Sequence, residues 1–163
     1  MKRAVKIIFM LTIILCFVAC VQKGNHKTAN DHAMEQTKET SRMLNKDLKQ
    51  IDEAIKQYIS RDKFIETADY PGIGDEELRK PLNELLNILA DTFQKIVHNQ
   101  PNEKQFQIAV KQLLDNMNNI YLDSEDQDQF CRSIEALMDI VGLESSDGSL
   151  NTWRYGFDPE QES

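Results

Sequence analysis

The densest set of reactive side chains is a run of four carboxylates: Asp123, Glu125, Asp126 and Asp128. Such a run suggests calcium, whose EF-hand loop needs a glycine at its sixth position and a glutamate at its twelfth. Counted from Asp123, those positions hold Asp128 and Ile134, so the motif fails. Acidic side chains in the first turn of a helix are stabilised by the helix dipole, which explains the cluster without a bound ion. We therefore expect no metal and no cofactor.

Two further side chains are candidates for acid–base or nucleophilic catalysis. His98 lies at the predicted end of a helix, where a cationic imidazole is favourable in any case. Cys131 follows Phe130 on the apolar side of a predicted helix, which favours a buried, unreactive thiol. The sequence contains no Gly-x-Ser-x-Gly or His-Glu-x-x-His motif, so we expect no enzymatic activity. A hydrolase using two distant carboxylates is the least favoured alternative.

Aromatic and polar residues alternate near the C-terminus, in the segment that contains Trp153, Arg154, Tyr155 and Phe157. A period of two predicts an extended tail with three aromatic rings on one side. Such a tail would lie across the helices and seal the edge of the core, because aromatic side chains bury large apolar areas. The alternative is an exposed recognition patch, since aromatic and arginine side chains are common binding anchors. These four residues are therefore our candidate partner-binding residues.

Four amphipathic helices are expected to position these side chains. Apolar residues recur at steps of three and four from Ser41 to Ser60, which predicts the first helix. Three similar segments end near His98, Asp123 and Gly142. Gly142 is the expected left-handed C-cap of the last helix, with Leu143 as its hydrophobic partner. Short connectors predict an all-α fold: a four-helix antiparallel bundle with the extended aromatic tail packed on it.

Three of the helix boundaries depend on local signals. Pro81 favours a start of the second helix near Lys80, after a separate short turn. The apolar stripe of the third helix is expected to continue through Tyr121. Ser124 and Gln127 have the spacing of a capping box, which predicts Ser124 as the N-cap of the fourth helix.

The N-terminus has the pattern of a bacterial signal peptide. Three basic residues precede an uncharged run of twelve residues, 7–18, whereas a helix that spans a bilayer needs roughly 20. The run leads into Phe17-Val18-Ala19-Cys20, which resembles the lipobox of bacterial lipoproteins, although that family usually has leucine where this chain has Phe17. The resemblance implies cleavage before Cys20 and acylation of its sulfur with a diacylglyceryl group, whose chains are typified by palmitate. An uncleaved signal anchor and ordinary secretion remain alternatives.

The resulting organisation has three parts: a cleaved signal peptide (1–19), a lipidated Cys20 with a flexible tether (20–40), and an acidic helical domain (41–163). The tether is polar and without period, so it cannot bury enough surface to order itself. Val21 is not the aspartate that retains enteric lipoproteins at the inner membrane. That resemblance implies an outer membrane location facing the periplasm, if the host is Gram-negative.

The charge of the chain bears on its partners. The net charge is -8, and removing the +3 of residues 1–19 leaves -11, which opposes nucleic acid and favours a protein partner with a basic surface. The helical part resembles uncharacterised small lipoprotein domains of no known activity. The leading hypothesis is a lipid-anchored, non-enzymatic interaction module of the cell envelope, for example an inhibitor of the immunity type. The alternative is a binding protein for a small apolar or aromatic ligand.

Overall fold

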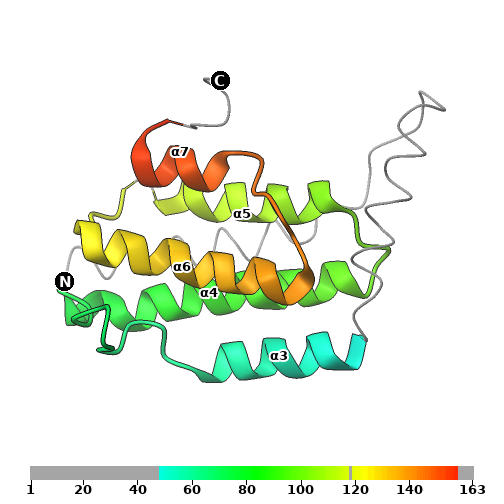
Figure 1. Ribbon diagram of the computed structural model, residues 1–163, viewed down its shortest axis with the longest axis horizontal. Coiled ribbons are helices and arrows are strands. Elements are labelled where there is room, and N and C mark those ends of the chain that lie inside the picture. The colour runs from blue at the N-terminus through cyan, green and yellow to red at the C-terminus, as the bar shows by residue number, and fades with distance from the viewer. Residues whose placement is uncertain (1–47, 118, 158–163) are drawn as a thin grey trace.

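Five helices make up the part of the chain that the computed structural model describes, residues 48–117 and 119–157 (Figure 1). They are α3 (Leu48–Ser60), α4 (Glu76–Val97), α5 (Glu103–Met117), α6 (Ser124–Val141) and α7 (Ser149–Tyr155). Apart from an isolated bridge between Thr67 and Tyr70, these residues contain no strand. The predicted all-α class is therefore confirmed.

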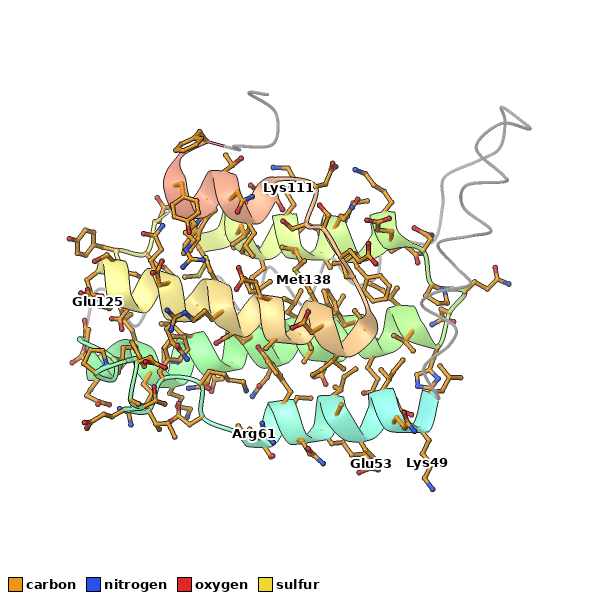
Figure 2. All side chains as sticks on the ribbon, viewed as in Figure 1. Lys49, Glu53, Arg61, Lys111, Glu125 and Met138 are labelled. Atoms are coloured by element: carbon orange, nitrogen blue, oxygen red, sulfur yellow. The ribbon has the colours of Figure 1, made fainter. Side chains whose placement is uncertain are left out.

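Consecutive helices run in opposite directions, as the colour gradient of Figure 1 shows. Helix α4 contacts α3, α5 and α6, while α7 lies against α5 and α6. Each long helix turns its apolar stripe inward, and the charged side chains of Lys49, Glu53 and Arg61 lie on the outer side of the molecule (Figure 2). The largest fully buried side chains include Phe64, Phe93, Phe106, Phe130, Leu82, Leu85 and Leu86.

The start of α4 differs from the prediction. The helix begins at Glu76, with Asp75 as its N-cap, and Pro81 lies inside it as the sixth residue. The side chain of Asp75 accepts a hydrogen bond from the backbone N–H of Glu77 at 3.1 Å. Acidic residues in the first turn add stabilisation through the helix dipole. Because Pro81 is so near the helix start, its missing N–H removes one early bond without ending the helix.

The end of α5 and the start of α6 also differ from the predictions. Helix α5 ends at Met117 and does not continue through Tyr121, whose side chain is 89% exposed and so adds no core packing to a longer helix. The N-cap of α6 is Asp123, one residue before the predicted Ser124. The Asp123 carboxylate accepts a hydrogen bond from the backbone N–H of Asp126 at 2.8 Å, and Asp is at least as good a cap as Ser.

The C-terminal end of α6 is as predicted. Gly142 has a φ of 75°, in the left-handed region that glycine adopts without a steric cost. The backbone N–H of Leu143 donates to the carbonyl of Met138 at 2.9 Å, and the Leu143 side chain is buried. These are the features of a Schellman motif with its hydrophobic contact.

The aromatic segment near the C-terminus is helical as far as Tyr155, so the prediction of an extended tail is wrong for Trp153 to Tyr155. Leu150 is buried and Trp153 packs against the core, and residues three apart share one face of a helix. The backbone N–H of Leu150 donates to the hydroxyl of Ser146 at 3.2 Å near the start of α7. The packing of Leu150 and Trp153 on the core therefore decides the secondary structure here, and the alternation of aromatic and polar residues does not.

Several predictions fall outside the described residues. These are the signal peptide, the lipidated Cys20, the tether to residue 40, and the part of the first helix from Ser41 to residue 47. Among the described residues, no helix combines the length and the apolar character needed to span a membrane.

Candidate functional site

The candidate residues Trp153, Arg154, Tyr155 and Phe157 lie at the end of α7 and just after it, and we call them the aromatic patch. Trp153 is half-buried, with its ring centroid 5.6 Å from that of Phe130 in α6. Tyr155 and Phe157 are 54% and 49% exposed, and their ring centroids are 6.5 Å apart. Trp153 therefore packs on the core, as expected for aromatic residues that seal it. Tyr155 and Phe157 remain at the surface, as expected for an exposed recognition patch.

Arg154 connects the aromatic patch to α6. Its Nε donates to Asp128 Oδ1 at 2.7 Å, and its Nη1 is 3.7 Å from Glu135 Oε1. The side chain of Arg154 is only 16% exposed, and the hydrogen bond to Asp128 raises the pKa of the guanidinium further. Its Cζ lies 5.1 Å from the ring centroid of Tyr155. The guanidinium is thus held in place between α6 and the Tyr155 ring.

Gln127 holds the C-terminal turn of α7 on α6, a role that sequence reasoning missed. Its Nε2 donates to the backbone carbonyls of Trp153 and Arg154 at 3.0 Å and 3.4 Å. The last carbonyls of a helix lack partners within the helix, so this side chain stabilises the docked end of α7. A local capping pattern suggested a role for Gln127 at the start of its own helix, and no local signal indicated the long-range contact.

A groove of about 890 Å³ lies beside the aromatic patch, between α5, the segment before α6, and α7. Its lining includes Lys104, Leu114, Met117, Tyr121, Thr152 and Trp153. Lys104, at one wall, pairs with Asp147 at 2.9 Å. The lining mixes apolar and aromatic side chains, the kind that line sites for small apolar ligands, with charged groups that are paired with each other.

The carboxylate run that begins at Asp123 has structural roles in this fold. Asp123 caps α6, and Asp128 binds Arg154. Asp126 is buried; its Oδ1 accepts from the Tyr70 hydroxyl at 2.5 Å and its Oδ2 from the Gly74 N–H at 3.1 Å. Within residues 48–117 and 119–157, no group of three or more His, Cys, Asp and Glu side chains could hold a metal ion.

The two candidates for catalysis belong to different helices, because His98 is the C-cap of α4 and Cys131 lies within α6. His98 Nε2 is 2.9 Å from Asp52 Oδ1, at the end of α4. Hydrogen bonds from Gln94 and His98 lower the pKa of Asp52. Cys131 is fully buried in α6, and burial raises the pKa of its thiol to about 12. Such a thiol is protonated at neutral pH and is a poor nucleophile.

Comparison with known proteins identifies relatives of the helical part. The chain is similar to a solved structure, a DUF3571 family protein from Acinetobacter baumannii, with 28% sequence identity and a TM-score of 0.61. The similarity covers 67% of this chain and 91% of that chain. No curated protein matches the chain. Residues 43–158 match a family described as a domain of unknown function, and the chain therefore belongs to this family, DUF4844.

Proposed function

We propose that this protein is a lipoprotein of the bacterial cell envelope that acts as a non-enzymatic protein-interaction module. In this proposal a diacylglyceryl group on Cys20 anchors the chain, at the outer membrane facing the periplasm in a Gram-negative host. Helices α3 to α6 form an antiparallel four-helix bundle that carries α7. The aromatic patch on α7 is the surface that contacts the partner.

The observation that carries the interaction role is the exposure of Tyr155 and Phe157 beside a fixed arginine. Large aromatic side chains are costly to leave in water, and aromatic and arginine residues dominate the binding energy of many interfaces. Arg154 is already ordered by Asp128, so a partner would meet a rigid surface. Rigid contact residues lose little conformational entropy on binding.

The lipid anchor is tested by labelling growing cells with a fatty acid analogue and isolating the protein. We expect label on the wild-type chain and none on a Cys20→Ser variant. Cys16→Ser is the matched control, because Cys16 lies in the same apolar segment but outside the cleavage junction. An unlabelled wild-type chain, or one that still begins at Met1, would contradict the anchored state.

The interaction role is tested with a photo-crosslinking amino acid at position 155 in the native host. We expect a discrete protein adduct from this position. Ile65 is the matched control, since it is a large apolar residue of similar exposure outside the aromatic patch. No adduct at position 155, or the same adducts from both positions, would contradict a specific interface on α7.

The groove beside α7 favours a second candidate function, the binding of a small apolar or aromatic ligand. Trp153 is the only tryptophan and lines the groove, so its fluorescence would report a ligand there. We expect quenching by an aromatic probe such as anilinonaphthalene sulfonate, lost in a Thr152→Arg variant, because Thr152 is an exposed residue of the groove lining and a longer side chain there would block it. Unchanged emission with saturating probe would count against this function.

A further inference from the structure

We propose that the aromatic patch binds a cationic side chain of its partner, so that the occupant is a protein segment bearing arginine or lysine. This inference rests on the proposed interaction function and specifies the partner's chemistry at the same site. Three features support it: the arrangement of the two exposed rings, an internal cation already seated on one of them, and the charge of the neighbouring helix.

The first feature is the pair of exposed, mutually tilted rings of Tyr155 and Phe157. Their planes are inclined at 44°, with centroids 6.5 Å apart. About half of each residue is exposed, so ring surface remains available to a partner. The faces of aromatic rings carry negative electrostatic potential and attract ammonium and guanidinium groups.

The second feature is the contact between Arg154 and Tyr155. The guanidinium carbon lies 5.1 Å from the ring centroid, within the roughly 6 Å range of cation–π attraction. The chain itself therefore places a cation over this ring. Arg154 is held there by Asp128 and Glu135, which leaves the exposed part of the Tyr155 ring and the Phe157 ring for an incoming cation.

The third feature is the charge of α6, the helix on which Arg154 is anchored. Its surface carries four carboxylates and one arginine: Glu125, Asp128, Glu135, Asp139 and Arg132. With Arg154 included, acidic groups outnumber basic ones by four to two. A cationic segment is attracted to such a surface, whereas an acidic peptide or an anionic lipid surface is repelled.

The test uses the fluorescence of Trp153, the single tryptophan of the chain and a member of the aromatic patch. The full chain in non-ionic detergent is titrated with a short peptide of alternating arginine and glycine. The matched peptide has glutamate in place of arginine. We expect saturable binding of the arginine peptide, weakened by added salt, and no binding of the glutamate peptide.

Paired variants locate the binding. Tyr155→Ser with Phe157→Ser should weaken binding of the arginine peptide about fivefold, which is the loss expected for exposed cation–π contacts. Leu48→Ser with Ile65→Ser removes two exposed apolar residues elsewhere and should leave the affinity unchanged. Without peptide, each variant should give the same circular dichroism spectrum and the same Trp153 emission as the wild type, which shows that α7 remains folded.

Each remaining outcome overturns a defined part of the inference. Equal affinity of the patch variant and the wild type, no binding of the arginine peptide, or equal binding of both peptides overturns the cationic occupant. If crosslinks still form from position 155, the interaction function stands with a different occupant. If the peptide binds as expected but no crosslinks form, the chemistry of the aromatic patch is supported and the cellular interaction role fails.

Discussion

Lys63 is a buried cation in the segment between α3 and α4. Its Nζ donates to Asn87 Oδ1 at 2.6 Å and lies 4.5 Å from the centroid of the Tyr58 ring. Burial lowers the pKa of Lys63 from 10.5 to about 8. The folded protein therefore loses this proton at a lower pH than the unfolded chain does.

This difference in pKa predicts a pH-dependent stability. Between about pH 8 and pH 10.5 the unfolded chain binds the proton that folded Lys63 has released, so the contribution of this residue to the free energy of unfolding rises with pH. In Lys63→Met that rise should disappear from urea unfolding curves measured across this range. Lys80→Met, at an exposed position of α4, should retain the wild-type dependence. Parallel wild-type and Lys63→Met profiles would contradict the assignment.

Cys131 is predicted to be chemically silent in the folded protein. Its side chain is fully buried and its thiol pKa is raised to about 12 by that burial, and thiolate is the reactive form. With Cys16 and Cys20 replaced by serine, a disulfide reagent such as dithionitrobenzoate should titrate no thiol in native buffer. It should titrate one thiol per chain in guanidinium chloride. Rapid labelling of the native protein would show that α6 opens readily.

At the scale of single elements, the end of α6 offers a clean test of backbone conformation. Gly142 has a φ of 75°, and a Cβ added there would meet nothing within 4 Å. Gly142→Ala should therefore cost only the left-handed strain, about 1 kcal/mol of unfolding free energy. Gly142→Asn should cost less, because asparagine adopts this conformation more readily. Equal losses in urea unfolding would indicate an effect other than backbone strain.

Local chemistry explains which element boundaries could be predicted. Gly142 was identified because a cap acts within a few residues of its own helix. The boundaries at Pro81 and Tyr121 were misplaced because a single breaker or a single apolar residue was weighed without its neighbours. Helix α7 was missed because the aromatic alternation concealed the spacing of Leu150 and Trp153, and the packing of both on the core favours the helix.

At the scale of the whole molecule, Tyr70 and Asp126 connect the α3–α4 segment to the start of α6 across 56 residues of sequence. Tyr70→Phe removes the hydroxyl and leaves the buried Asp126 carboxylate short of a donor, which should cost about 2 kcal/mol of unfolding free energy. Tyr121→Phe is the matched control, because its side chain lies in solvent and should be neutral. Similar losses in the two variants would show that the buried bond contributes little.

The amino-acid order alone was sufficient to predict the all-α class and most helix positions, because periodicity and caps act over a few neighbouring residues. Packing between distant segments decided the rest. It buried Trp153 against Phe130 and left Tyr155 and Phe157 at the surface. It also placed Arg154 between Asp128 and Glu135. These outcomes depend on which helix faces lie against each other, and no local pattern in one chain specifies that choice.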